Sequence, residues 1–164
     1  MAYYRLFYHV VWTTKNRQAI LTSAVEPIVY NFIRAKAIGL GGTVFSLNGV
    51  EDYVHMVASI PPKIAVATFI GQVKGVATAH FNQQYPDKAF YWQESYGVFS
   101  FDGKRLPNVI AYVERQKEHH AQNTIIPVLE RVEGDSSQPM IREYQETYLV
   151  NDEAWHQEMM LWEM

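Results

Sequence analysis

The sequence predicts an α+β protein in which an antiparallel sheet is covered by helices. Strand-like runs of aromatic and β-branched residues alternate with longer segments whose apolar residues recur at helical spacing. The connections between these segments are short and carry Gly, Pro, Asp or Asn. The chain has 164 residues, which is enough for one domain with a substantial core and too few for two of ordinary size.

The chain begins with a predicted strand and a predicted helix. Residues 3–14 are nearly continuous in aromatic and β-branched side chains, which predicts a strand buried on both faces at the centre of the sheet. Ser23 and Glu26 have the spacing of a capping box. We therefore expect a helix to begin at Ser23 and to end near Gly39.

A hairpin and a second helix follow. Residues 43–50 and 54–60 are predicted to pair as antiparallel strands around a Glu-Asp turn. Apolar residues at helical spacing between Pro62 and Pro86 predict the second helix. We expect Lys74 on the face of this helix opposite the apolar stripe, where it is either solvated or in contact with a phosphate.

A fourth strand and a third helix complete the predicted fold. Residues 90–101 are rich in aromatic residues, and Gly97 interrupts them, which indicates that the loop before the strand approaches another segment closely. Pro107 is well placed in the first turn of the third helix. The order β-α-β-β-α-β-α is that of a ferredoxin-like, or RRM-like, split βαβ sandwich with one extra helix. Because this fold hosts many unrelated functions, function has to be argued from the site.

The character of the chain changes after Pro127. Residues 133–139 have the composition of a linker, and residues 141–164 are acidic and aromatic. We therefore expect a folded domain over residues 1–130 and an acidic linker and tail over residues 131–164. The aromatic side chains of the tail need a cover, which the main body or a dimer interface could provide.

Composition excludes several classes of function. The chain has no cysteine, which removes disulfides, thiolate nucleophiles and Cys-based zinc sites. Its net charge of -3 argues against binding to duplex DNA over a long footprint, although basic residues before Glu130 could form a local groove. The aromatic share of 14% is compatible with stacking on single-stranded nucleic acid and equally with a packed sheet. The apolar run of residues 6–12 is too short to cross a membrane, so we expect a cytoplasmic protein without a membrane partner.

One segment at the end of the third helix could carry chemistry. Tyr112, Gln116 and His119 fall within a narrow sector of one helix face at about 100° per residue. A tyrosine hydroxyl has a free pKa of about 10 and is a poor nucleophile unless a metal polarises the group that it attacks. The alternative is that Tyr112 lies at the rim of an amphipathic helix and that Gln116 is solvated.

The hairpin supplies a candidate ligand for such a metal. With period two, Tyr53, His55 and Val57 share one face of the third strand. A single histidine on a strand is either a hydrogen-bonded structural residue or a ligand, and its position alone leaves both open.

Four segments together resemble the single-tyrosine HUH transposases of the insertion-sequence-200-like group, whose relatives include the REP-associated tyrosine transposases. The resemblance covers residues 3–123. The four segments are residues 8–17 (YHVVWTTKNR), 52–59 (DYVHMVAS), 92–100 (WQESYGVFS) and 112–120 (YVERQKEHH).

This resemblance implies a specific chemistry. It implies that Tyr112 attacks a phosphodiester in single-stranded DNA and leaves a 5′-phosphotyrosine and a free 3′-OH. It also implies a divalent ion, Mg²⁺ or Mn²⁺, held by two histidines of a His-hydrophobic-His strand and by a polar residue one turn after the tyrosine. The matching positions here are His55 and Gln116. Members of the group are homodimers that act on DNA with hairpin ends, so we expect a DNA transposase without a small-molecule substrate.

Position 53 departs from the pattern, because Tyr53 stands where the motif has histidine. A neutral phenol is a poor ligand for a divalent ion near neutral pH. His9 or His119 could supply the missing donor, a substrate phosphate could complete the coordination, or Tyr53 itself could be a ligand or a second nucleophile. The alternative function is a hairpin-binding protein in which cleavage has been lost.

Either function requires basic residues that contact DNA. The turn after the first strand is polar and basic, although such a turn can also be simply solvated. An RNA-binding module of RRM type would instead need exposed aromatic residues on the central strands, and Phe7 and Val57 look more like core residues. The residues that we expect to contact DNA are Lys15, Arg17, Lys74, Lys104 and Arg105.

Overall fold

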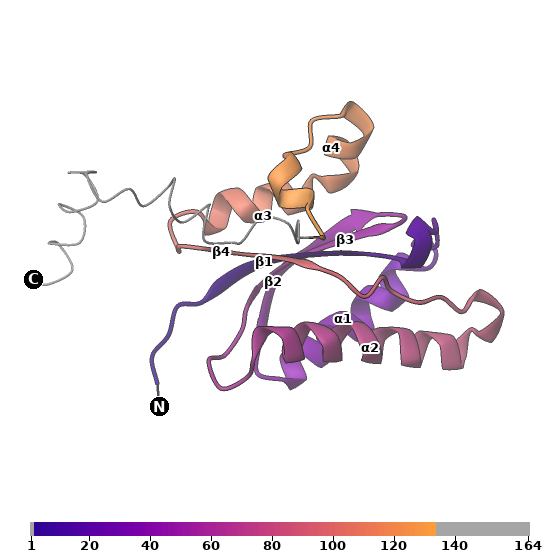
Figure 1. Cartoon of the computed structure of the whole chain (residues 1–164), viewed down its shortest axis with the longest axis horizontal. Coiled ribbons are helices and arrows are strands. Elements are labelled where there is room, and N and C mark those ends of the chain that lie inside the picture. The colour runs from indigo at the N-terminus through magenta and orange to yellow at the C-terminus, as the bar shows by residue number, and fades with distance from the viewer. Residues whose placement is uncertain (1, 134–164) are drawn as a thin grey trace, which may run out of the picture. The chain divides into compact units, whose positions relative to one another are not determined.

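The computed structural model describes residues 2–133, and its centre is a four-stranded antiparallel sheet (Figure 1). Strands β1 (Phe7–Thr13) and β3 (Tyr53–Ser59) lie in the middle of the sheet, while β2 (Thr43–Val50) and β4 (Gly97–Phe101) form its edges. The strand order is β2-β3-β1-β4, and each neighbouring pair is antiparallel. The predicted central position of the first strand and the predicted hairpin are both confirmed.

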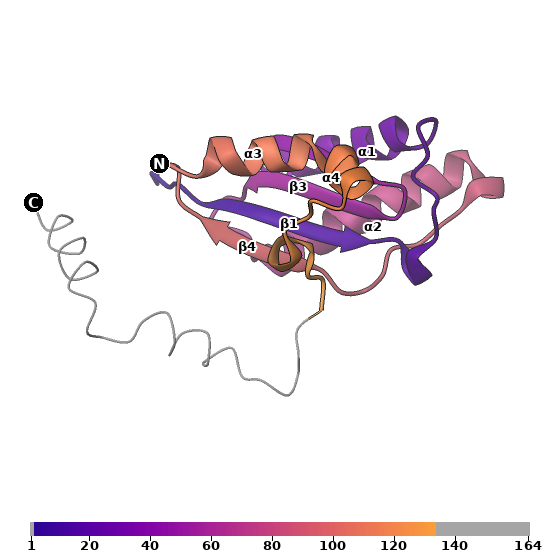
Figure 2. The ribbon, with the colours of Figure 1, turned by 90° about the horizontal axis from the view of Figure 1, so that it is seen from above.

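Helices cover both faces of the sheet. Helices α1 (Glu26–Gly39) and α2 (Val66–Gln84) lie on one face, while α3 (Leu106–Glu114) and α4 (Gln116–Gln122) lie on the other (Figures 1 and 2). A short 3-10 turn, η3 (Pro127–Glu130), follows α4 and contacts β1 and β4. The predicted order of elements is confirmed, with the extra helix divided in two.

The two faces of β3 meet different surroundings, because side chains alternate along a strand. Val54 and Met56 are fully buried in the larger core, between the sheet and the α1–α2 layer. Each such side chain stabilises the fold by roughly 1.5–3 kcal/mol. Tyr53, His55 and Val57 point to the opposite face, where Val57 belongs to a smaller apolar cluster with the end of α3. The predicted shared face of these three residues is therefore confirmed.

The predicted start of the first helix is wrong. Helix α1 begins at Glu26, its N-cap residue is Val25, and no side chain caps it, so Ser23 does not serve as a cap. The residues before the helix form a turn instead, in which the carbonyl of Thr22 accepts hydrogen bonds from the main-chain N–H groups of Val25 and Glu26. This turn satisfies N–H groups that a capping box would otherwise bind.

The first strand is shorter than the sequence predicts. Strand β1 begins at Phe7 because both neighbours end there: Phe7 pairs with Ser59 of β3 and with Phe101 of β4. The residues before it have no strand beside them, and Tyr3 is 87% exposed. Strand β4 begins at Gly97, and the aromatic residues before it form the loop that the sequence predicts there.

Lys74 does not lie opposite the apolar stripe of α2, as the sequence predicted. Its side chain is only 7% exposed. The ammonium group donates hydrogen bonds to the main-chain carbonyls of Gln93, Glu94 and Ser95 at 2.7, 3.3 and 3.3 Å. Burial lowers the pKa of Lys74 to about 8. The prediction fails because helical spacing does not reveal the loop before β4, which folds over this position.

The predicted third helix is interrupted at Arg115. This residue has φ -100° and ψ 18°, so α3 ends at Glu114 and α4 begins at Gln116. Gln116 still follows Tyr112 by one turn, and its side-chain nitrogen donates a hydrogen bond to the Tyr112 carbonyl at 3.4 Å. The directions of the two histidines further along α4 therefore cannot be obtained by extending the periodicity of α3.

The last described residues pack against β4. The main-chain carbonyl of Arg131 lies in the space that a Cβ atom at Gly97 would occupy. The close approach predicted at Gly97 is therefore confirmed. Residues 134–164, which include most of the predicted linker and tail, lie outside the described residues. Across residues 2–133, none of the helices combines the length and the apolar character needed to cross a membrane.

Candidate active site

The two middle strands bring a pair of histidines together on the face that α3 covers. His9 of β1 and His55 of β3 are both buried, and His9 Nε2 lies 2.8 Å from His55 Nδ1. Burial lowers the pKa of His55, and burial together with the proximity of His55 lowers the pKa of His9 to about 3. Both imidazoles are therefore neutral near pH 7, which is the form that binds metal ions. The contact with His9 uses Nδ1 of His55 and leaves Nε2 facing the rest of the site.

Tyr112, the candidate nucleophile, lies beside these histidines in the same chain. Its ring packs edge-on to His55, with 6.3 Å between the ring centroids. The hydroxyl donates a hydrogen bond to Glu130 Oε1 at 2.5 Å and accepts one from the main-chain N–H of Ile126 at 3.0 Å. Burial, and then the hydrogen bond to Glu130, raise the pKa of Tyr112 to about 12. The phenol therefore keeps its proton in this arrangement, and that proton points at Glu130.

Glu130, at the end of η3, lies at the centre of the site. Its Oε2 atom is 3.0 Å from His55 Nε2 and 3.5 Å from His120 Nε2, while its Oε1 atom accepts the Tyr112 hydrogen bond. Burial raises the pKa of this carboxyl, but the hydrogen bonds from His55 and Tyr112 outweigh burial and lower the pKa of Glu130 to about 2. An ionised carboxylate is thus shared by side chains from β3, α3 and α4.

Tyr53 is buried beside Glu130 and binds its main chain. The Tyr53 hydroxyl donates a hydrogen bond to the Glu130 carbonyl, and its ring stacks on His55 with 5.6 Å between centroids. The guanidinium group of Arg17 lies over the Tyr53 ring at 4.4 Å and forms an ion pair with Asp52 at 2.7 Å. Burial raises the pKa of Tyr53, so its phenol is protonated and its hydrogen is directed at a carbonyl.

His119 and His120 point in different directions. His119 Nδ1 lies 2.9 Å from Thr124 Oγ1, and the His119 ring stacks on Tyr112 with 4.8 Å between centroids. His120 faces Glu130 instead, and its Nε2 atom is buried without a hydrogen-bond partner. The structure therefore brings His120, rather than His119, to the shared carboxylate.

Gln116, the second ligand implied by the resemblance, is fully buried at the start of α4. Its side-chain nitrogen donates a hydrogen bond to the Tyr112 carbonyl, whereas its Oε1 atom has no hydrogen-bond partner. Buried polar atoms without a partner are rare in folded proteins. An amide oxygen is also one of the ligands that hard divalent cations accept.

The donor atoms of this site fit a divalent ion. Within the described part of the chain, one group of His, Asp and Glu side chains can converge on a single ion, and its ligating atoms all lie within 4.8 Å of one another. This group is His55, His120 and Glu130. Two imidazole nitrogens and a carboxylate suit Mn²⁺ and neighbouring first-row divalent ions. His9 does not belong to the group, because its Nε2 atom contacts His55.

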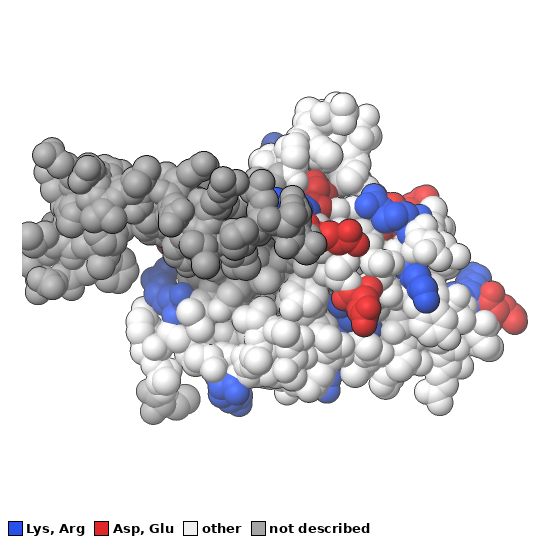
Figure 3. Space-filling model, in the orientation of Figure 1, with Lys and Arg blue, Asp and Glu red and all other residues white. Residues whose placement is uncertain are grey.

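The five basic residues predicted to contact DNA fall in three places. The first pair is exposed on the 3-10 turn η1, which follows the end of β1 at Thr13. The second pair is exposed after β4, at the opposite end of β1, because these two strands are antiparallel. The fifth is the buried lysine of α2. The first pair is Lys15 and Arg17, the second pair is Lys104 and Arg105, and the fifth residue is Lys74. In the view of Figure 3 the basic side chains of the described residues are scattered, and those on the right lie between acidic ones.

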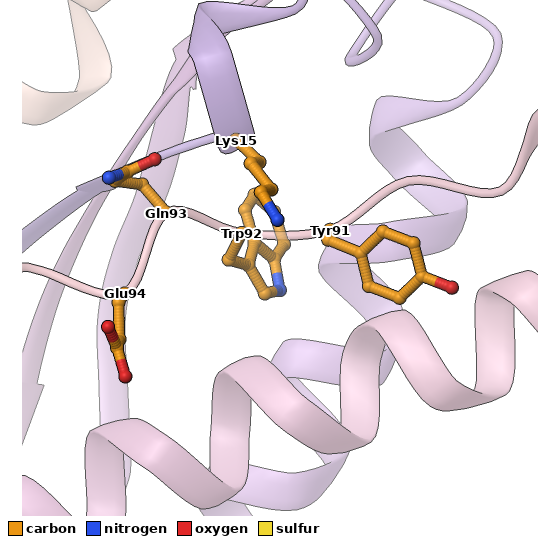
Figure 4. A pocket seen from close by; sticks show the side chains of 5 residues that line it. All are labelled: Lys15, Tyr91, Trp92, Gln93 and Glu94. Carbon is orange, nitrogen blue, oxygen red and sulfur yellow. The ribbon is translucent and has the colours of Figure 1, made fainter.

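Turn η1 (Lys15–Arg17) also borders a pocket. The pocket has a volume of 390 Å³ and is lined by Lys15 together with Tyr91, Trp92, Gln93 and Glu94 (Figure 4). Tyr91 is 64% exposed. A lysine and an exposed aromatic ring thus border the same pocket, and these are the groups that contact phosphates and bases in single-stranded nucleic acid.

Sequence reasoning missed the role of Glu130, and the predicted domain boundary falls at this very residue. No helical or strand periodicity surrounds Glu130, so pattern analysis gives it no direction. One signal was available. Gly97 was predicted to mark a close approach, and the chain that approaches it is the residue after Glu130.

Comparison with known proteins places this chain in a family. The family model described as "Transposase IS200 like" matches residues 2–116. The ISDra2 transposase TnpA of Deinococcus radiodurans is 26% identical over 121 residues, which cover 70% of this chain and 86% of that protein. The transposase for insertion sequence element IS200 of Salmonella typhimurium is 26% identical over 117 residues, which cover 68% of this chain and 76% of that protein.

Two solved structures have a similar fold. A Deinococcus radiodurans transposase aligns with a TM-score of 0.58 and 25% identity, over 70% of this chain and 93% of that one. The REP-associated tyrosine transposase bound to a REP hairpin aligns with a TM-score of 0.56 and 13% identity, over 73% of this chain and 74% of that one, and supports the fold alone. Because the family model spans the sheet, His55, Tyr112 and Gln116, and covers well over half of the sequence, the chain belongs to the IS200-like transposase family.

Proposed function

We propose that this transposase cleaves and rejoins single-stranded DNA at hairpin ends, with Tyr112 as its nucleophile and Mg²⁺ or Mn²⁺ as its cofactor. One observation carries the proposal: the Tyr112 hydroxyl lies in the same buried site as His55, His120 and Glu130. Membership of the family supports DNA joining in general. The chemistry of these side chains supports the finer assignment.

The cleavage step can be written from the groups in the site. The Tyr112 oxygen forms a bond to phosphorus while the bond from phosphorus to the 3′ oxygen breaks. The phenol proton leaves towards Glu130, which accepts its hydrogen bond, and the departing 3′ oxygen receives one proton in return, so that the step releases no net proton. The products are a 5′-phosphotyrosine and a free 3′-OH. A bound divalent ion would stabilise the negative charge that develops on the phosphate oxygens.

Rejoining is the reverse of this step with a different 3′-OH. That hydroxyl attacks the phosphotyrosine, the bond to Tyr112 breaks, and the phenol regains its proton. One phosphodiester is restored for each one cleaved, so the exchange needs no external energy source. Burial of Tyr112, which is only 7% exposed, supports this reaction because it keeps bulk water away from the covalent intermediate.

The surroundings of the site support a path for single-stranded DNA. Arg17 is exposed on η1, and its guanidinium lies over the Tyr53 ring and pairs with Asp52 at the edge of the site. Lys15, on the same turn, borders the pocket that Tyr91 and Trp92 also line. A strand held at Tyr112 would pass Arg17 before reaching this pocket. We include a homodimer in the proposal.

A covalent-adduct assay tests the proposal. Single-stranded hairpin oligonucleotides tiled across the DNA that flanks the gene are incubated with Mg²⁺ or Mn²⁺ and analysed on a denaturing gel. We expect an adduct with the wild-type protein and with Tyr3→Phe, a matched control at an exposed tyrosine. Tyr112→Phe should form none. An adduct that persists in Tyr112→Phe would assign the nucleophile elsewhere.

A second function is favoured by Tyr53, which stands where the family pattern has histidine. The alternative protein binds DNA hairpins without cutting them. It is supported if wild-type protein binds the oligonucleotides but forms no adduct with either metal. In that case Tyr53→His, which restores the first histidine of the motif, is expected to yield an adduct that the wild type does not form.

A further inference from the structure

Tyr53, which stands where the family pattern has histidine, makes a hydrogen bond of its own within the site. The Tyr53 hydroxyl is directed at the main-chain carbonyl of Glu130, to which it donates its hydrogen. That contact holds the segment whose side chain enters the site between His55 and His120. The residue that replaces the expected histidine therefore binds the residue that brings a carboxylate to the same place.

We propose that His55, His120 and Glu130 form the metal site of this chain. In this site Glu130 supplies the ligand that the family pattern obtains from a histidine at position 53. This inference rests on the proposed function, because the ion it describes is the cofactor of that reaction. It adds two ligands that nothing in the family pattern assigns. The family model matches residues 2–116, and both His120 and Glu130 lie beyond this range.

The distances support a shared ion. His55 Nε2 and Glu130 Oε2 are 3.0 Å apart, His120 Nε2 and Glu130 Oε2 are 3.5 Å apart, and the whole set lies within 4.8 Å. Donor atoms that bind one ion at about 2.0–2.2 Å are separated by at most about 4.4 Å. Small side-chain rotations are therefore enough to bring all three donors onto one ion.

Two unsatisfied atoms point to the same conclusion. His120 Nε2 is buried without a hydrogen-bond partner, and so is Oε1 of the fully buried Gln116. Leaving such atoms unpaired costs free energy in a folded protein. An ion bound by His120 would satisfy the first atom directly, and the second atom belongs to the residue that follows Tyr112 by one turn.

His9 completes the arrangement as a positioning residue. A histidine that binds a metal through Nε2 normally donates its Nδ1 hydrogen to a neighbouring acceptor, which holds the ring in orientation. His9 Nε2 lies 2.8 Å from His55 Nδ1 and can accept that hydrogen. His9 thus holds the His55 ring in orientation, and the Glu130 carboxylate supplies the ligand that the strand motif lacks.

Metal binding can be measured without DNA and without catalysis. Full-length metal-free protein is titrated with Mn²⁺, and free Mn²⁺ is followed by its electron paramagnetic resonance signal. We expect Glu130→Gln and His120→Asn each to bind Mn²⁺ at least about tenfold more weakly than wild type. Glu118→Gln removes an exposed carboxylate from α4 and should bind as wild type does. Thermal melting of each metal-free variant verifies that it is folded.

A double variant tests the exchange of ligands directly. Tyr53→His in the Glu130→Gln background restores the two-histidine motif, so we expect it to recover Mn²⁺ affinity that Glu130→Gln loses. Failure of this rescue would contradict the replacement of the histidine by Glu130. Wild-type affinity in Glu130→Gln, or no Mn²⁺ binding by the wild-type protein, would overturn the metal site as a whole.

The outcome is distinguishable from that of the adduct assay. Mn²⁺ binding that depends on Glu130, in a protein that forms no adduct, would retain the metal site and refute the cleavage function. An adduct that depends on Tyr112, in a protein whose Mn²⁺ affinity is indifferent to Glu130, would retain the function and refute this ligand set.

Discussion

The main-chain carbonyl of Arg131 lies against Gly97, in the space that a side chain at that position would need. Glu130 precedes Arg131, so this contact fixes where the Glu130 carboxylate enters the site. Gly97→Ala should displace the segment, because the obstructing atoms belong to the Arg131 backbone and to the packed Val11 side chain. We expect adduct formation to fall by about 10–100-fold, as small displacements of catalytic groups do. Single-turnover adduct kinetics measure this loss.

Gly71 offers a matched control for this substitution. It lies inside α2, and a Cβ atom there would have nothing within 4 Å. Alanine is a better helix former than glycine by about 1 kcal/mol, so Gly71→Ala should raise the free energy of unfolding slightly and leave adduct formation unchanged. Full activity in Gly97→Ala would show that the contact with Arg131 does not position the carboxylate.

The strand positions of the site could be predicted from sequence, since local periodicity is sufficient for them. Period two along β3 put Tyr53 and His55 on one face, and the structure stacks their rings on each other. Helical spacing put Gln116 one turn after Tyr112, and that relation survives the interruption at Arg115. Alternation holds along β3 because successive side chains of a strand point to opposite faces of the sheet.

Glu130 and Lys74 could not be predicted, because their partners are distant in sequence and leave no periodic trace. Glu130 meets His55 across 75 positions. Lys74 donates hydrogen bonds to main-chain carbonyls of the loop before β4. Any residue type supplies such a carbonyl, so no sequence motif marks these partners. The direction of the His120 side chain could not be predicted either, although its neighbours in sequence are close. His119 and His120 diverge because they are adjacent on a helix, and the break at Arg115 decides which of the two faces the Glu130 carboxylate.

The buried ammonium group of Lys74 should stabilise the loop before β4. Lys74→Met removes a donor that three carbonyls share and leaves these carbonyls partly buried. We expect the free energy of unfolding to fall by about 1–3 kcal/mol, measured by urea denaturation. Lys88→Met, at an exposed lysine, should change it by less than about 0.5 kcal/mol. Equal stability of the two variants would mean that Lys74 does not hold the loop.

The guanidinium group of Arg17 lies over the Tyr53 ring, and we expect it to contact a phosphate of the bound strand. Arg17→Ala should weaken binding of a single-stranded oligonucleotide and reduce the slope of log affinity against log salt by about 0.7, the value for one phosphate contact. Fluorescence anisotropy across a salt series measures both quantities. Lys63→Ala, at an exposed lysine beyond the other end of β3, is the control. A salt slope that is unchanged in Arg17→Ala would place the strand away from η1.

The buried pair of His9 and His55 should make the stability of the metal-free protein depend on pH. Burial lowers the pKa of His9 to about 3 in the folded chain, against about 6.5 when it is unfolded, so only the unfolded chain takes up a proton as the pH falls below 6.5. Stability is therefore complete above this pH and is lost progressively towards pH 3, with about 2 kcal/mol lost to His9 by pH 5. Urea denaturation at pH 7.5, 6 and 5 in the presence of a chelator measures the loss. His9→Gln should flatten this dependence, whereas His80→Gln, at an exposed histidine of α2, should keep it. Identical pH profiles for wild type and His9→Gln would show that the proton is not excluded from His9.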